Sequence, residues 1–158
     1  MIEKMAPERR GQPWRLLDLR DRALLLVGSA GAFRRSELVG LNVEDLEFVR
    51  DGVVVHLRRS KTGQEGQGRR VGIPRGQKAE TCPVRALHAY LVRAGIEVGT
   101  IFRSMTRHGT VGGCLSDRAV ALIVKDRAKA VGLDPERLAG HSLRAGLATS
   151  AAAAGLGL

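Results

Sequence analysis

The sequence is poor in aromatic side chains. Only 3% of its 158 residues are Phe, Trp or Tyr, namely Trp14, Phe33, Phe48, Tyr90 and Phe102. Proteins that stack on single-stranded nucleic acid, like sheets that recognise RNA, need several exposed aromatic rings in series. The composition therefore argues against a base-stacking platform.

Cysteines and long apolar runs are also scarce. Cys82 and Cys114 lie far apart and match no zinc spacing, which favours a reduced, cytoplasmic interior. No apolar run approaches the roughly 20 residues of a membrane span. The first residues lack the hydrophobic region of a signal peptide. We therefore expect a soluble cytoplasmic protein with no membrane segment.

Positive charge, by contrast, is abundant. The 26 Lys and Arg residues exceed the 16 Asp and Glu residues, which gives a net charge of +10, and Arg greatly outnumbers Lys. Guanidinium groups suit bidentate binding of phosphate. The excess indicates a polyanionic partner, most simply nucleic acid. A basic surface that only aids solubility would account for the net charge equally well.

The length allows one sizeable core, so residues 16–158 are predicted to form one domain. Residues 1–15 are charged and broken by proline and glycine, which predicts a flexible lead-in. Residues 46–73 alternate with period two around the turn dipeptide Asp51-Gly52, which predicts a three-stranded antiparallel meander.

Helices are predicted from their boundary residues. One short turn is expected from Arg35 towards Leu41, and four longer helices are expected elsewhere. These are a helix capped by Asp18 and weakened near its end by Gly28 and Gly31, a helix from Pro83 to Gly95, a helix from Ser116 to Gly132, and a last helix from about Ser142 to Gly155.

The segment Gly31–Leu38 places Arg34 at the mouth of the short helix, with Glu37 one turn further on. A carboxylate in this position can hold the guanidinium rigid so that it faces a phosphate. An ordinary surface Arg in an amphipathic turn is the more common situation for such a segment taken alone.

Lys61 lies in a glycine-dotted loop between the second and third predicted strands. A Lys on a hairpin loop can swing into an active site and donate a proton to a leaving oxygen. The alternative is a solvated Lys at a hairpin tip. The loop is flanked by a cationic ribbon that we expect to contact DNA, made of Arg58, Arg59, Arg69 and Arg70.

His141 and Arg144 stand three residues apart at the predicted start of the last helix, so they lie on one face. The positive potential of a helix N-terminus favours an anion there. The alternative role for His141 is capping or packing.

Taken together, these three segments resemble the tyrosine recombinases, the phage-integrase type of site-specific recombinase. That family has an Arg in a G-x-R-x-S-E-L-type helix start, a Lys on a β-hairpin and an H-x-L-R helix start. This sequence matches them in the same order over about residues 16–155, with Ala32 in place of the first glycine. The resemblance implies an α+β fold, mainly α-helical with a small three-stranded antiparallel sheet.

The resemblance also implies roles for these residues. Arg34 and Arg144 would clamp the non-bridging oxygens of a scissile phosphate, and Lys61 would protonate the departing 5′ oxygen. His141 would donate a hydrogen bond to the phosphate or help to move a proton, and Glu37 would support Arg34. Double-stranded DNA would be the partner, bound by a homotetramer of the parent protein without a metal, a cofactor or a small-molecule substrate. Arg35 would join Arg58, Arg59, Arg69 and Arg70 in contacting the DNA.

The sequence departs from the family at its end. In the family a second His or Trp and then the nucleophilic Tyr follow the H-x-L-R helix. Here 158 − 144 = 14 residues follow Arg144, and Tyr90, the only Tyr, lies mid-helix as a packing aromatic. We therefore expect a catalytic domain incomplete at its C-terminus, which binds DNA weakly and does not cleave it. Two alternatives are a non-catalytic DNA-binding or regulatory remnant, and a generic basic module for RNA or protein partners.

Overall fold

The computed structural model describes residues 15–57, 68–106 and 108–130. Helices and a small antiparallel sheet are both present, as predicted, whereas residues 1–14 and the helix expected near Ser142 lie outside the described residues. The helices are α1 (Leu16–Ala30), α2 (Arg35–Val39), α3 (Pro83–Ala94) and α4 (Asp117–Ala130), with 3₁₀ turns at Val43–Asp45 and Ala79–Thr81. The strands are β1 (Leu46–Val49), β2 (Gly52–Leu57), β3 (Arg69–Pro74), β4 (Arg103–Met105) and β5 (Val111–Cys114).

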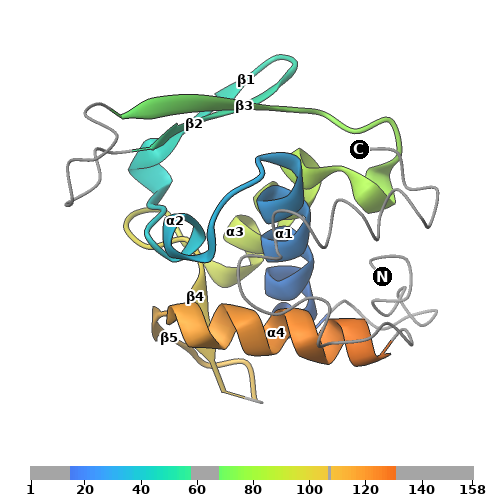
Figure 1. Ribbon diagram of the computed structural model, residues 1–158, viewed down its shortest axis with the longest axis vertical. Helices are drawn as coiled ribbons and strands as arrows, with labels where there is room; N and C mark the ends of the chain where they lie inside the picture. Colours follow the sequence, from blue (N-terminus) through green and yellow to red (C-terminus); the bar gives the residue numbers. More distant parts are fainter. Residues whose placement is uncertain (1–14, 58–67, 107, 131–158) are drawn as a thin grey trace.

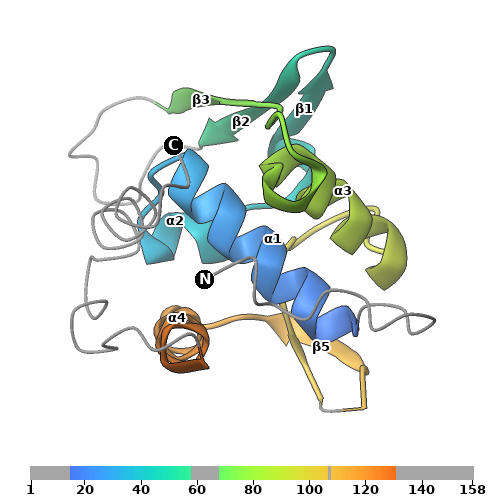
Figure 2. The same ribbon diagram turned by 90° about the vertical axis from the view of Figure 1, so that its right-hand side faces the viewer.

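The described elements are arranged around α1. Figures 1 and 2 show the β1-β2-β3 sheet at one end of the molecule, α3 beside α1 beneath that sheet, and α4 with the β4-β5 hairpin at the other end. Packing of α1 on α3 is the most extensive contact between helices. Each helix in this part of the chain is too short or too polar to cross a membrane.

The central position of α1 explains why it is buried on nearly all sides. The five consecutive residues from Ala23 to Val27 are all buried, and five residues exceed one helical turn. The prediction that Asp18 caps this helix is wrong. The helix begins at Leu16 after Arg15, and the Asp18 carboxylate instead lies 2.7 Å from a terminal nitrogen of Arg127 in α4.

The chain leaves α1 through a Schellman turn. The Phe33 N–H donates to the Gly28 carbonyl (3.1 Å) and the Ala32 N–H donates to the Ser29 carbonyl (3.2 Å). Such a turn needs one left-handed residue, which is usually glycine. Here it is Ala32, with φ of +52°. This is the position at which the sequence pattern has Ala in place of Gly.

The three-stranded sheet follows the predicted meander, in the order β1-β2-β3 and fully antiparallel. Val53, Val55 and Ile73 share its buried face. The turn lies one residue earlier than predicted, because Val49 pairs with Gly52 and leaves Arg50 and Asp51 as the loop. Gly52 is needed for close approach instead, since a Cβ there would lie 2.1 Å from the Ile73 carbonyl oxygen.

The boundaries of α3 and the start of α4 agree with the sequence analysis. Pro83 occupies the first turn of α3, and Gly95 ends it with a left-handed φ of +67°. The Ser116 hydroxyl accepts the Ala119 N–H at 3.0 Å, which caps α4. The stop predicted at Gly132 lies outside the described residues.

The β4-β5 hairpin was not predicted. It is antiparallel with an irregular register, and two of the four residues of β5 are Gly112 and Gly113. Glycine is unfavourable in strands, so no period-two signal appears in this segment of the sequence. The hairpin is held from outside: the Tyr90 hydroxyl of α3 donates to the Ile101 carbonyl (2.7 Å) and accepts the Arg103 N–H (3.4 Å).

Candidate nucleic-acid interface

Arg34 is presented by a short, firmly anchored helix. It is the N-cap of α2, with extended backbone angles. The residues at the two positions of a hydrophobic staple around it, Phe33 and Leu38, are both completely buried. Arg34 itself is exposed. Two core anchors thus fix the backbone from which the Arg34 side chain extends.

Glu37 connects α2 to the sheet. One carboxylate oxygen accepts the backbone N–H of Arg34 at 2.8 Å, as in a capping box. The same carboxylate pairs with a terminal nitrogen of Arg69, the first residue of β3, at 3.0 Å. Glu37 therefore holds the backbone of Arg34 and fixes the position of Arg34 relative to the start of β3.

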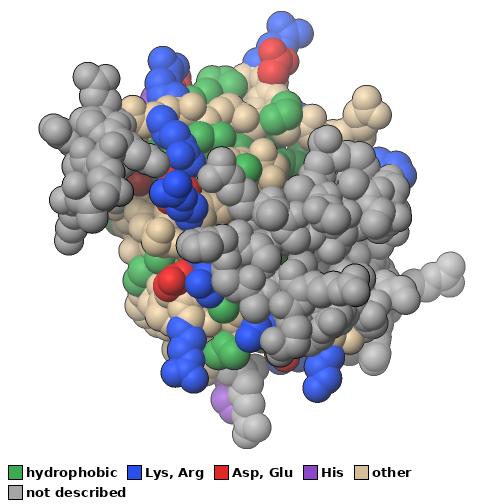
Figure 3. All heavy atoms as spheres, in the orientation of Figure 1, with side chains coloured by type: hydrophobic (Ala, Val, Ile, Leu, Met, Phe, Trp, Pro, Cys, Tyr) green, Lys and Arg blue, Asp and Glu red, His purple; other side chains and the backbone are tan. Residues whose placement is uncertain are grey.

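The other basic residues predicted to bind DNA are distributed over two faces. Arg35 pairs with Asp117 at the start of α4 (3.3 Å). Arg69 and Arg70 are successive residues of β3, so their side chains point to opposite faces of the sheet. Arg69 lies on the side of α2, whereas Arg70 is exposed opposite His56. Figure 3 shows that basic side chains outnumber acidic ones on one face of the molecule.

The remaining predicted site residues cannot be placed. Lys61, Arg58, Arg59, His141 and Arg144 lie outside the described residues. The base of the loop that contains Lys61 is described, however, because Leu57 of β2 pairs with Arg69 of β3. Since Arg69 binds Glu37, and Glu37 binds the Arg34 backbone, the base of the Lys61 loop lies beside the Arg34 helix start.

A buried charge network, which the sequence analysis missed, joins α1 to α4. Asp21 accepts hydrogen bonds from Arg20 (2.8 Å) and Arg127 (2.8 Å), and Arg127 also reaches Asp18 (2.7 Å). Arg20 further donates to the Arg103 carbonyl of β4 at 3.2 Å. The side chains of Arg20 and Asp21 are each only 6% exposed. Two cations and two carboxylates thus form an overall neutral cluster.

The electrostatics of this network favour the charged form of Arg127. Burial opposes the positive charge of Arg127, but the hydrogen bonds that Arg127 donates to Asp18 and Asp21 outweigh burial and raise the Arg127 pKa. The only sequence signal of this network is the spacing of Asp18 and Asp21, which lie three residues apart on one helix face. Arg127, which binds both carboxylates, is more than a hundred residues away in sequence.

Tyr90 has the packing role predicted for it. Its side chain is completely buried and stacks on Phe102, with ring centroids 6.0 Å apart. Burial raises the Tyr90 pKa, which disfavours the phenolate. With its hydroxyl engaged by the Ile101 carbonyl and the Arg103 amide, Tyr90 is not placed to attack a phosphate.

Titratable ligands do not gather into a metal site in the described part of the chain. Within residues 15–57, 68–106 and 108–130, no group of three or more His, Cys, Asp and Glu side chains could hold a metal ion. The charged groups that the described interface does offer to an anion are guanidiniums.

Comparison with known proteins gives the family. The model of the phage integrase family matches residues 7–158. The chain is 50% identical to "Integrase/recombinase xerD homolog" of Selenomonas ruminantium over 139 residues, which is 87% of this chain and 41% of that protein. It is 34% identical to "Tyrosine recombinase XerC" of Thermodesulfovibrio yellowstonii over 131 residues, which is 79% of this chain and 38% of that protein.

The chain spans about two fifths of the length of these curated relatives. The family match extends over nearly the whole sequence, including all three motif segments on which the resemblance rests. The chain belongs to the phage integrase family, the tyrosine recombinases.

Proposed function

We propose that this chain is the phosphate-clamping part of the catalytic domain of a site-specific tyrosine recombinase. It binds double-stranded DNA, and in the parent protein it takes part in strand cleavage and rejoining. The two relatives are both named as recombinases. The parent acts as a homotetramer on DNA, in the cytoplasm.

The observation that carries this proposal is the bridge formed by Glu37. Its carboxylate contacts both the Arg34 backbone and Arg69, which closes the base of the loop that contains Lys61. A phosphate clamp and a proton donor have to face the same phosphodiester, so their supports have to be adjacent. The bridge supplies that adjacency in the described part of the site.

The proposed chemistry follows from the charge on the phosphate. As the scissile phosphorus becomes five-coordinate, negative charge accumulates on its non-bridging oxygens, and Arg34 and Arg144 stabilise it. Lys61 gives a proton to the departing 5′ oxygen. His141 donates a hydrogen bond to the phosphate or helps to move a proton. Arg35, Arg58, Arg59, Arg69 and Arg70 contribute contacts to the DNA backbone.

The attacking Tyr is proposed to come from sequence other than residues 1–158. Tyr90 is the only Tyr in these residues, and it is buried with its hydroxyl in use. In the parent, attack by a Tyr would give a 3′-phosphotyrosyl link, which conserves the bond energy for rejoining. The chain by itself is therefore expected to bind DNA without cutting it.

Binding can be tested with Arg34→Gln, using Arg118→Gln as the matched control. Arg118 is exposed on α4 and has the same charge. We expect R34Q to weaken binding of a duplex by about tenfold and to reduce the salt slope by about 1, because one phosphate contact is lost. Equal effects of both variants would show that only net charge matters. Stronger competition by RNA or heparin than by duplex DNA would contradict the proposal.

Cleavage can be tested separately with a nicked suicide substrate, which traps a covalent phosphotyrosyl adduct. We expect no adduct from the 158-residue chain. An adduct that survives denaturation, and that Tyr90→Phe abolishes, would contradict the assignment of Tyr90 as a packing residue.

A further inference from the structure

A second surface lies at the other end of the sheet. A pocket of about 330 Å³ opens between β1 and α3 and is lined by Phe48, Arg75, Val84, Arg85 and His88. Arg69, which binds Glu37, begins β3, and Arg75 follows its last residue. Six extended residues span about 17 to 20 Å, so this pocket is well separated from the Arg34 helix start.

The apolar part of the pocket arises from the geometry of the sheet. Phe48 lies opposite Val53 on the buried face, yet β1 is an edge strand and Phe48 remains 45% exposed. The His88 ring of α3 lies edge-on to the Phe48 ring, with ring centroids 6.3 Å apart. The neighbouring Val49 is also exposed at 41%. An aromatic side chain of the core face is thus left open to solvent.

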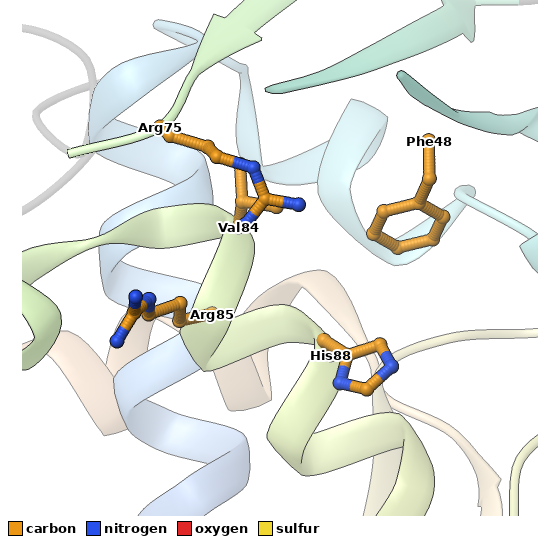
Figure 4. Close-up of a pocket in the computed structure, with 5 residues that line it drawn as sticks. All are labelled: Phe48, Arg75, Val84, Arg85 and His88. Atoms are coloured by element: carbon orange, nitrogen blue, oxygen red, sulfur yellow. The ribbon is translucent and has the colours of Figure 1, made fainter. Parts of the chain in front are cut away.

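The polar part of the pocket is cationic. Arg75 donates through Nε to the Arg50 carbonyl at 3.2 Å. No residue in the described part of the chain forms a hydrogen bond or ion pair with its two terminal nitrogens, and the same holds for the Arg85 guanidinium. Figure 4 shows the Arg75 guanidinium reaching past Val84 in the direction of Phe48, whereas the Arg85 side chain extends away from Phe48.

We propose that this pocket binds an acidic peptide segment of a partner protein. An apolar side chain of the peptide packs against the exposed ring of Phe48, and flanking carboxylates pair with Arg75 and Arg85. The pocket volume is at the lower limit of ligand sites, roughly 300 Å³, which accommodates one or two side chains. Exposed aromatic and Arg residues around such a pocket are the types that dominate binding energy at protein interfaces.

A peptide fits this pocket better than DNA does. A charged sugar-phosphate backbone offers little apolar surface to place against the exposed Phe48 ring, so it would gain little from covering that ring. Carboxylates beside a leucine or phenylalanine side chain satisfy both the guanidiniums and the apolar floor. This site is independent of the proposed phosphate clamp, and its occupancy does not require DNA.

The test uses the full chain and three blocked nonapeptides in NMR titrations of the ¹⁵N-labelled protein. The first alternates glutamate with leucine, the second replaces glutamate with lysine, and the third replaces leucine with serine. We expect only the first to shift the amide signals of β1 and of the first turns of α3. Absence of binding by the first peptide, or equal binding by all three, would overturn the proposal.

Variants distinguish this site from a DNA contact. Arg85→Gln should weaken binding of the peptide roughly threefold to tenfold, because one charge-assisted ion pair with a peptide carboxylate is lost. Arg118→Gln, which removes the same charge from α4, should leave peptide binding unchanged. Phe48→Ala should abolish binding, and its spectrum reports directly whether it folds. The opposite outcome is that R85Q weakens the binding of duplex DNA, while the peptide neither binds the protein nor competes with DNA. In that case the pocket belongs to the DNA interface and the proposal fails.

Discussion

Two regions of the molecule use the same chemical pair, an arginine and a carboxylate, in opposite surroundings. The Asp18, Asp21, Arg20 and Arg127 network lies between α1 and α4, and its Arg20 and Asp21 side chains are buried. The Glu37–Arg69 pair lies nearer the surface, with the Arg69 side chain 37% and the Glu37 side chain 18% exposed. Removing Asp21 from the first leaves the Arg20 charge almost without solvent, whereas removing Glu37 from the second leaves the Arg69 charge in contact with water. The first region is therefore a structural anchor, and the second is available for function.

The largest expected effect is on the buried network. Asp21→Ala leaves Arg20 and part of the Arg127 guanidinium without their carboxylate, and we expect the free energy of unfolding to fall by about 3 to 5 kcal/mol. Urea denaturation measures this directly. The matched control is Asp117→Ala, which removes an exposed pair with Arg35 and should cost at most about 1 kcal/mol. Similar losses in both variants would contradict the comparison.

An intermediate effect is expected at Tyr90, whose buried hydroxyl joins α3 to the β4-β5 hairpin. Tyr90→Phe removes a hydrogen bond to the Ile101 carbonyl, which should cost about 1 to 2 kcal/mol. The raised pKa of Tyr90 adds a pH dependence. Its contribution is complete below the ordinary Tyr pKa of about 10 and is lost as pH rises through the higher folded value, because the unfolded chain ionises first.

The pH dependence can be measured as the difference in unfolding free energy between wild type and Y90F. We expect this difference to be constant from pH 7 to about 9 and to shrink in more alkaline buffer. A difference that grows with pH would mean that the folded state favours the phenolate, contrary to the burial of this side chain.

The smallest effect is expected at the exposed pair. A double-mutant cycle of Glu37→Gln and Arg69→Gln should give a coupling energy of about 0.5 kcal/mol, because solvent screens the charges. Glutamine retains an oxygen that can cap Arg34, so the helix start is preserved. The coupling should decrease at high salt. A coupling energy above about 2 kcal/mol would mean that the Glu37–Arg69 pair behaves energetically like the buried network, contrary to the comparison.

The sequence predicted those features whose cause is local. Pro83, Gly95 and Ser116 mark helix boundaries because each one acts on its own turn of backbone. The three-stranded sheet was predictable from alternation along short segments. Likewise, the family was recognisable because its motifs at Arg34, Lys61 and His141 are short and contiguous.

Features that depend on distant partners were not predictable. Asp18 looks like a cap in sequence, but its carboxylate is used by Arg127, more than a hundred residues away. The glycines of β5 gave no strand signal, since Tyr90 from α3 fixes that hairpin. Of the four proposed catalytic residues only Arg34 is described, so the convergence of all four on one phosphate stays a prediction.

The left-handed backbone of Ala32 has a kinetic consequence. A non-glycine residue in this conformation raises the energy of the closed turn by about 1 kcal/mol. The Phe33 amide, bonded to the Gly28 carbonyl, should therefore exchange with deuterium severalfold faster than the same amide in Ala32→Gly. Evolution could thus adjust how often the arginine-bearing helix start opens by changing a single methyl group, without altering any residue that touches a phosphate.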